Sequence, residues 1–240
     1  MKKLLSIAIV LVLGFLCTSP CLAQAQKPSD LKYPPLKYDP PDPKDFRMEF
    51  KNGLRGYIKE ERELPLFAIS AQIDFGSLYV PDDKLGLASL MSSTMIKGGT
   101  ATREGTEIEE RLNFLGGSLS FRVGERTSTL TLSVLSKDMD EGLELFFDVL
   151  MHPEFREAPL NLAKASAIAR LRQANDQPNG VLSREFDRLL YGEHPLTRQA
   201  FQKSYEGVTG SDLKAAHAQY FFPKNVILAA WGDFDKAGLK

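Results

Sequence analysis

The 240-residue chain contains few side chains that could hold a metal ion. Its three histidines are His152, His194 and His217, and no two of them have the i, i+3 or i+4 spacing that places two ligands on one helix face. The two cysteines, Cys17 and Cys21, lie near the N-terminus. Because zinc is held by imidazole, thiolate or carboxylate groups, this composition predicts no metal centre in the chain.

Three serines, Ser89, Ser92 and Ser93, lie in one predicted helix and are candidate nucleophiles. A serine attacks only when a base lies within hydrogen-bond reach. The nearest base along this helix is Lys97, four residues after Ser93, which is not the S-x-x-K spacing of lysine-assisted serine enzymes. We therefore interpret the serines as a small polar stripe, and an enzyme with an unrecognised mechanism remains the alternative.

The N-terminal residues follow the order of a secretory signal peptide. A basic start (residues 1–3) precedes an apolar run (residues 4–16), and small residues follow at Ala23 and Ala25. The apolar run is shorter than the roughly 20 residues that a membrane-spanning helix needs. We expect cleavage after Ala23 or Ala25, which makes residues 1–23 the signal peptide of a secreted or periplasmic bacterial protein without a membrane anchor.

The composition of the chain predicts one globular domain that follows a linker. Hydrophobic residues make up 43% of the chain and the formal net charge is −1, which is typical of a globular protein and lacks the basic excess of a nucleic-acid binder. Six of the 14 prolines lie in residues 24–45, which predicts an extended linker. The domain is expected over residues 46–240.

Periodicity within this domain predicts strand pairs and helices. Strands are expected at residues 47–50, 54–60, 67–75, 118–123, 127–134 and 226–231. Helices are expected from Asp83 to the Gly98-Gly99 pair, at residues 106–115, 138–150, 158–174 and 181–190, and from Thr209. Because the strands come as hairpins and the helices follow, we predict an α+β fold, with a mainly antiparallel sheet and helices packed on one face.

Six segments in a fixed order resemble a known family. They are Asn52–Pro65, Ile73–Thr100, Leu112–Phe121, Met151–Phe155, Tyr191–Leu196 and Tyr220–Asp235. In order and spacing they resemble the N-terminal domain of the insulinase-like (pitrilysin-type) zinc metallopeptidases, which include the mitochondrial processing peptidases. The resemblance implies the mitochondrial-processing-peptidase-like metallohydrolase fold, with the C-terminal domain of the family absent from this chain.

The same resemblance implies that the zinc motif of the family is lost. Active members carry H-x-x-E-H, in which two histidines bind zinc and the glutamate activates water. The matching positions hold Ser89 and Ser93 in place of the histidines and Ser92 in place of the glutamate. The third ligand, a glutamate on a later helix, falls at Ala169 or Arg170. No catalytic residue, metal ligand or cofactor is therefore expected in this chain.

The family also implies partners. Bacterial members resemble heterodimers in which one subunit carries zinc and the other does not, so this chain resembles a non-catalytic subunit that assists proteolysis or binds peptide. Its expected partners are a zinc-bearing subunit, a C-terminal-domain complement and a peptide. The peptide would add as a strand beside the edge formed by Gly117, Ser118, Leu119 and Ser120. The alternative is a stand-alone extracytoplasmic peptide-binding or scaffold protein without a proteolytic role.

Overall fold

The computed structural model describes residues 38–236. The expected signal peptide and most of the proline-rich linker lie outside the described residues. Asp42–Lys240 forms one compact unit, and residues 38–41 belong to a separate unit, Met1–Pro41. Within the compact unit, a 3₁₀ turn at Pro43–Asp45 leads directly into the first strand.

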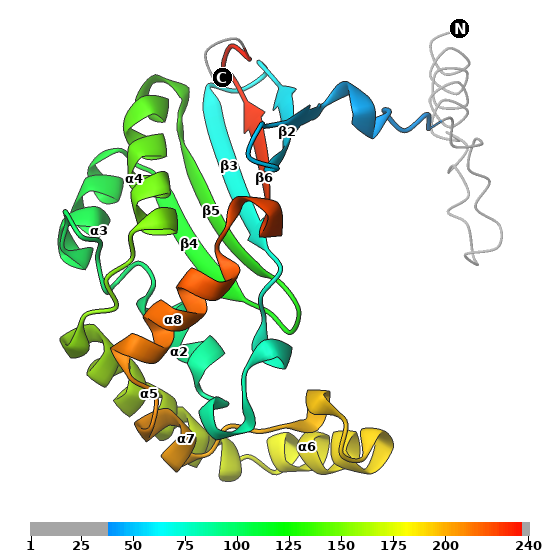
Figure 1. Cartoon of the computed structure of the whole chain (residues 1–240), viewed down its shortest axis with the longest axis vertical. Helices are drawn as coiled ribbons and strands as arrows, with labels where there is room; N and C mark the ends of the chain where they lie inside the picture. The colour runs from blue at the N-terminus through cyan, green and yellow to red at the C-terminus, as the bar shows by residue number, and fades with distance from the viewer. Residues whose placement is uncertain (1–37, 237–240) are drawn as a thin grey trace, which may run out of the picture. The chain divides into compact units, whose positions relative to one another are not determined.

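Six strands form one sheet in the order β1-β2-β6-β3-β5-β4 (Figure 1). Their bounds are β1 Arg47–Glu49, β2 Arg55–Glu60, β3 Leu66–Ile73, β4 Ser118–Val123, β5 Ser128–Leu135 and β6 Val226–Gly232. Strands β2 and β6 run parallel, and the other neighbouring pairs are antiparallel. The predicted α+β fold with a mainly antiparallel sheet is therefore confirmed.

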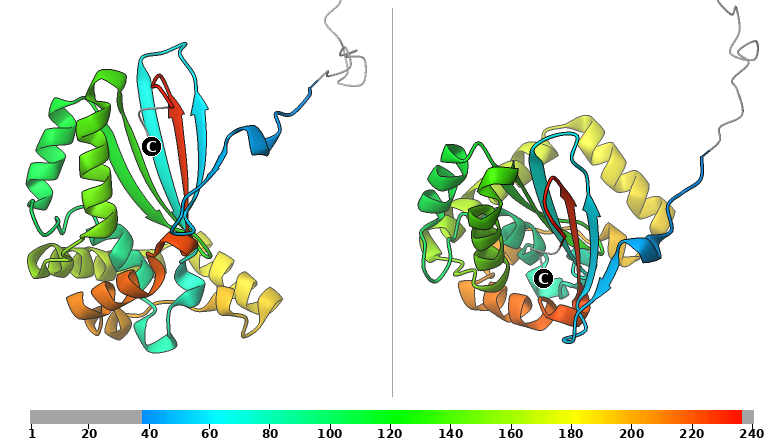
Figure 2. Two further views of the ribbon diagram at one scale, coloured as in Figure 1. Left: turned by 45° about the horizontal axis from the view of Figure 1, so that its top comes forward. Right: turned by 90° about the horizontal axis from the view of Figure 1, so that it is seen from above.

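Helices cover one face of this sheet (Figure 2). Among residues 38–236 the helices are α2 Leu87–Thr94, α3 Gly105–Phe114, α4 Met139–Met151, α5 Glu157–Asn175, α6 Pro178–Tyr191, α7 Gln202–Glu206 and α8 Gly210–Tyr220. Helices α2, α3 and α4 contact the sheet, whereas α6 contacts mainly α5 and the turn at Pro195–Thr197. Helix α4 packs along β5, while α2 lies between β4 and α5. The site described below depends on this last placement, because it brings α2 and α5 together at the edge of the sheet.

Alternation along the strands divides the sheet into a core face and an open face. In β3, Phe67, Ile69, Ala71 and Ile73 are buried, whereas the residues between them are half-buried or exposed. A strand presents successive side chains to opposite faces, so one face of β3 supplies apolar surface to the helices. Complete burial of Phe67 contributes on the order of 1.5–3 kcal/mol.

The expected helix from Asp83 begins later than the sequence predicted. A 3₁₀ turn occupies Asp82–Lys84, and α2 begins at Leu87. Besides the 3₁₀ bond from the Lys84 amide to the Pro81 carbonyl (3.0 Å), the Lys84 side chain donates to the Gly207 carbonyl (2.7 Å) and to Asp212 Oδ2 (3.0 Å), so contacts with the C-terminal segment also hold this turn. The short helix α7 was also not predicted.

No helix among residues 38–236 combines the length and the apolar character needed to cross a bilayer.

Candidate functional site

The three candidate serines lie on the side of α2 that faces away from the core. The core side of this helix consists of buried Leu87, Ala88, Leu90, Met91 and Thr94. The three serines are half-buried. Ser93 Oγ donates to the Ser89 carbonyl (3.0 Å), and Ser92 Oγ donates to the Phe121 carbonyl on β4 (3.3 Å). Two of the hydroxyls therefore serve local and tertiary hydrogen bonds.

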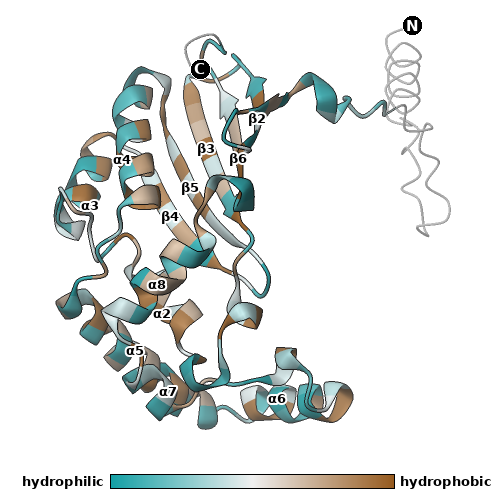
Figure 3. Cartoon of the chain, viewed as in Figure 1, coloured by the Kyte–Doolittle hydropathy of each residue, from teal (hydrophilic) through white to brown (hydrophobic). Residues whose placement is uncertain are grey.

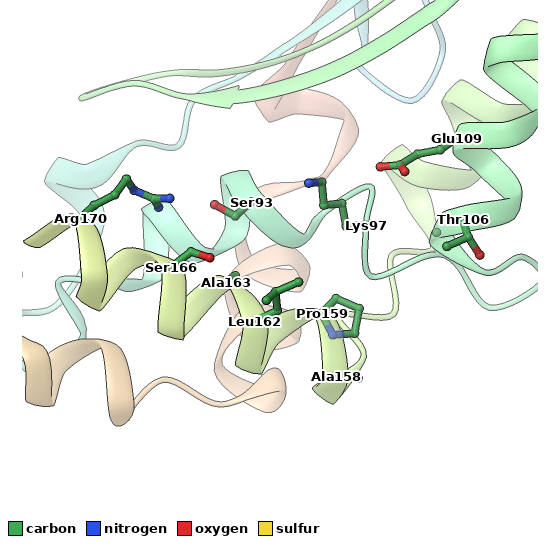
Figure 4. A pocket seen from close by; sticks show the side chains of 11 residues that line it. Ser93, Lys97, Thr106, Glu109, Ala158, Pro159, Leu162, Ala163, Ser166 and Arg170 are labelled. Carbon is green, nitrogen blue, oxygen red and sulfur yellow. The ribbon is translucent and has the colours of Figure 1, made fainter.

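An open cavity of about 480 Å³ lies between α2, α5 and the start of α3. Figure 4 shows its lining residues; Ser93 projects from α2, and Ser166 and Arg170 project from α5. Ser93 lines this cavity, whereas Ser89 and Ser92 do not. Of the two candidate third-ligand positions, Arg170 lines the cavity and Ala169 is exposed outside it. The structure therefore brings Ser93 and Arg170 to one site.

The loop between α2 and α3 forms one wall of the cavity and is tied down by Arg156. Its guanidinium donates to the carbonyls of Gly98 (2.6 Å) and Thr100 (2.9 Å). Gly105, the first residue of α3, packs so closely against the Lys97 carbonyl that a Cβ atom would clash with it. The positions of Lys97 and of the α3 N-terminus are therefore fixed by the backbone.

A partly buried carboxylate, Asp148, reinforces the same loop from α4. It accepts hydrogen bonds from Thr100 Oγ1 (2.6 Å), Thr102 Oγ1 (3.0 Å) and Arg103 Nη1 (3.1 Å). Burial raises the pKa of Asp148, but the bonds from the two threonines and Arg103 outweigh burial and hold the pKa below its usual value. The network stabilises the loop and has no member in the cavity.

The three histidines are not among the residues that line this cavity, and each has its own structural contacts. His217 Nε2 lies 2.9 Å from the Leu150 carbonyl and its ring stacks on Phe221. Burial lowers the pKa of His217, which favours the neutral ring. His194 Nδ1 accepts from the Leu196 amide (3.2 Å), and His152 follows the last residue of α4.

The side chains of the cavity do not fit a zinc ion. Its polar groups are hydroxyls of Ser93, Thr106 and Ser166, the cations Lys97 and Arg170, and a single carboxylate, Glu109. Zinc requires several imidazole, thiolate or carboxylate donors, and two cations would repel it. Across residues 38–236, no three His, Cys, Asp or Glu side chains group closely enough to hold a metal ion.

The predicted peptide-binding edge lies beside α2. Within residues 38–236, strand β4 pairs only with β5, so Ser118, Leu119 and Ser120 belong to the last strand of the sheet. The Gly117 amide donates to the Leu112 carbonyl (2.9 Å) at the end of α3, which leads the chain into the strand. Ser92 holds the Phe121 carbonyl, so α2 contacts the same strand.

One polar residue of the cavity, Ser166, was missed by sequence reasoning. It lies four residues before Arg170 on α5, and this spacing places both side chains on one helix face. The spacing was the available signal, but only the packing of α2 against α5 identifies which face of the long helix is used.

The fold thus combines a six-stranded sheet, a helix layer and a cavity between α2 and α5 whose lining contains one potential metal donor, Glu109. A family model described as insulinase (peptidase family M16) matches residues 60–203. The chain belongs to the insulinase family.

Relatives and a solved structure agree with this assignment. An uncharacterized zinc protease of Mycobacterium tuberculosis is 23% identical over 156 residues, which cover 64% of this chain and 35% of the relative. The probable mitochondrial-processing peptidase subunit beta of Arabidopsis thaliana is 22% identical over 183 residues, 75% of this chain and 34% of the relative. A crystal structure of a peptidase M16 inactive domain from Pseudomonas fluorescens superposes with a TM-score of 0.73 at 26% identity, covering 80% of this chain and 47% of that one. The chain thus matches less than half the length of each.

Proposed function

We propose that this protein is a secreted, non-catalytic member of the insulinase family that assists proteolysis or binds peptide together with a zinc-bearing partner. The observation that carries the proposal is the set of side chains in the cavity, where Ser93 and Arg170 line the wall and Glu109 is the single carboxylate of the lining. The solved relative described as an inactive domain gives it independent support.

Hydrolysis by this chain alone conflicts with the chemistry of the site. A zinc ion lowers the pKa of its bound water from 15.7 to about 7. Serine hydroxyls and an arginine guanidinium cannot activate water in this way. Serine attack needs a base within reach, whereas Ser93 Oγ donates to the carbonyl of its own helix. We therefore assign substrate cleavage to the partner.

A surface for the partner is provided by α6. No residue of this helix is buried, and Leu182, Phe186, Leu189 and Leu190 are 58–85% exposed. Figure 3 shows the hydrophobic residues on this helix, which contacts mainly α5 and the turn at Pro195–Thr197. Exposed apolar residues at helical spacing are typical of protein interfaces. Since the chain matches less than half of its relatives' length, the occupant we propose is another insulinase-family domain.

The role in peptide binding rests on β4. Strand addition needs exposed backbone groups more than particular side chains, so it does not depend on a metal. The edge strand Ser118–Val123 lies next to α2 and its cavity. A peptide bound there would be presented by this chain and cut by the zinc-bearing partner.

The proposed secretion depends on residues 1–23 alone. Their basic start, apolar run and small-residue junction are the features by which signal peptides are processed. N-terminal sequencing of protein recovered from the periplasm or medium is expected to begin at Gln24 or Gln26; protein that retains Met1 in the cytoplasm would contradict this part of the proposal.

A reconstitution experiment tests the proposed function. The full chain is captured gently from its native extracytoplasmic fraction, so that a bound partner is recovered with it and identified. The partner is then produced separately and its activity is assayed on a quenched fluorescent peptide. We expect no cleavage by this chain alone and faster cleavage when it is added to a partner that carries H-x-x-E-H. No binding and no change in rate would refute the proposal.

Two variants connect that result to α6. The double change Phe186→Glu and Leu189→Glu places charge on the exposed apolar face and should abolish the pairing. Arg188→Glu introduces the same carboxylate on the exposed polar side of the same helix and serves as the matched control. Pairing that survives the double change would exclude α6 as the interface.

A further inference from the structure

The cavity beside α2 differs in charge from a metal site. Its two cationic side chains, Lys97 and Arg170, come from different elements, the end of the α2 segment and α5. Neither has a hydrogen-bond or ion-pair partner among residues 38–236. Figure 4 shows Ser93 between them, with both charged groups directed toward the middle of the cavity.

Hydroxyl groups supplement these cations. Ser166 on α5 and Thr106 on α3, both of which carry hydroxyl groups, line the same cavity. The first residues of α3 also line it, and the amides of a helix N-terminus carry partial positive charge. The opposing group is Glu109, which approaches from the α3 side next to Lys97 (Figure 4).

From this arrangement we propose that the cavity binds the carboxylate of a peptide, between Arg170, Ser166 and Lys97. A guanidinium binds a carboxylate with two parallel hydrogen bonds, and an ammonium adds a third charged donor. Glu109 contributes the one negative charge of the lining, against the two cations. A site that binds a cation in zinc-bearing relatives would here bind an anion.

A peptide carboxylate suits the remaining walls better than a small inorganic anion. Ala158, Pro159, Leu162 and Ala163 form an apolar wall along α5 that can take the hydrocarbon part of a residue. The adjacent β4 edge can pair with the peptide backbone, and this part of the argument rests on the proposed function. The carboxylate can come from the peptide C-terminus or from an Asp or Glu side chain.

The test compares small probes that differ only at the carboxylate. The ¹⁵N-labelled full chain is titrated with N-acetyl-Ala-Leu, which ends in a free carboxylate, and with N-acetyl-Ala-Leu amide, and binding is followed by amide chemical shifts. We expect the free carboxylate to shift the amides of Ser93, Lys97 and Gly105 and to bind about tenfold more tightly than the amide. N-acetyl-Asp amide tests whether a side-chain carboxylate binds instead of a C-terminal one. Inorganic phosphate tests whether a small anion binds in place of the carboxylate.

Two variants make the titration specific. Lys97→Ala with Arg170→Ala should remove the preference for the free carboxylate. Arg172→Ala is the matched control, because it removes the same charge from α5 outside the cavity, where Arg172 bonds Gln202 (3.3 Å). Equal binding of acid and amide, tighter binding of phosphate, or unchanged binding by the double variant would overturn the proposal.

The result of this titration does not depend on whether the chain pairs with a zinc-bearing partner. The double variant retains α6, so it should still pair with a zinc-bearing partner. If the double variant loses carboxylate binding but still pairs with the partner, the cavity binds the carboxylate and has no part in pairing. If the unchanged protein binds the carboxylate but does not pair, only the proposed subunit role is contradicted.

Discussion

Restoring the metal donors should convert the cavity into a zinc site. The fourfold variant Ser89→His, Ser92→Glu, Ser93→His and Arg170→Glu places two imidazoles at i and i+4 on α2 and a carboxylate on α5. Residues at this spacing are neighbours on a helix face, about 5–6 Å apart at Cβ. Catalytic zinc sites use three protein ligands and a water molecule. Ser93 and Arg170 already line the cavity, and the longer histidine side chain at position 89 has to reach it from the neighbouring turn of α2.

The expected stabilisation can be measured by heating. A metal present at 100 times its dissociation constant stabilises the folded state by about 2.7 kcal/mol. For a domain of this size each kcal/mol raises Tm by roughly 2–4 °C, so zinc should raise Tm by about 5–11 °C. Without zinc, the variant should unfold more easily by about 1 kcal/mol, because the Ser92 hydrogen bond to Phe121 is lost.

The control keeps Arg170 and changes only the three serines. The Arg170 guanidinium should repel the zinc ion, so the zinc-dependent rise in Tm should be smaller in this control than in the fourfold variant. Calorimetric titration should give one zinc per chain. A folded fourfold variant whose Tm does not respond to zinc would refute the prediction that this face of α2 and position 170 of α5 can hold one ion.

Three further predictions concern the framework. Asp148→Asn should lower the free energy of unfolding by about 2–3 kcal/mol at pH 7. Because the folded-state pKa of Asp148 is lowered, this difference should shrink as the pH falls below about 4 in urea titrations. His217→Gln should remove a loss of stability below about pH 6.5, where the unfolded chain binds a proton that the buried ring resists; an unchanged pH profile would contradict this. Gly105→Ala should destabilise the domain by about 2 kcal/mol in the same assay, because its Cβ meets the Lys97 carbonyl.

Local patterns predicted the strands well, because alternation in segments such as Phe67–Ile73 reports directly which face is buried. The start of α2 was predicted too early, because Lys84 is held by Asp212, far away in the sequence. The third-ligand position was ambiguous between Ala169 and Arg170 for a related reason. A shift of one residue along the helix separates Arg170, which lines the cavity, from Ala169, which does not, and packing between α2 and α5 decides which position faces the cavity.

The cavity contains residues that the sequence revealed as well as residues that only the fold could place. The serines of α2 were visible as a group in the sequence, whereas Ser166 could be placed beside Ser93 only through the fold. The exposure of α6 was likewise hidden, since its apolar spacing is also that of a core helix.

Native mass spectrometry of the endogenous protein, purified gently from the extracytoplasmic fraction, tests the central claim most directly. It reports the mature N-terminus, the bound subunits and the metal content together. The account predicts a complex with a second chain that carries H-x-x-E-H, and one zinc ion per complex. A metal-free monomer or homodimer without such a partner would contradict it and would favour a stand-alone peptide-binding protein.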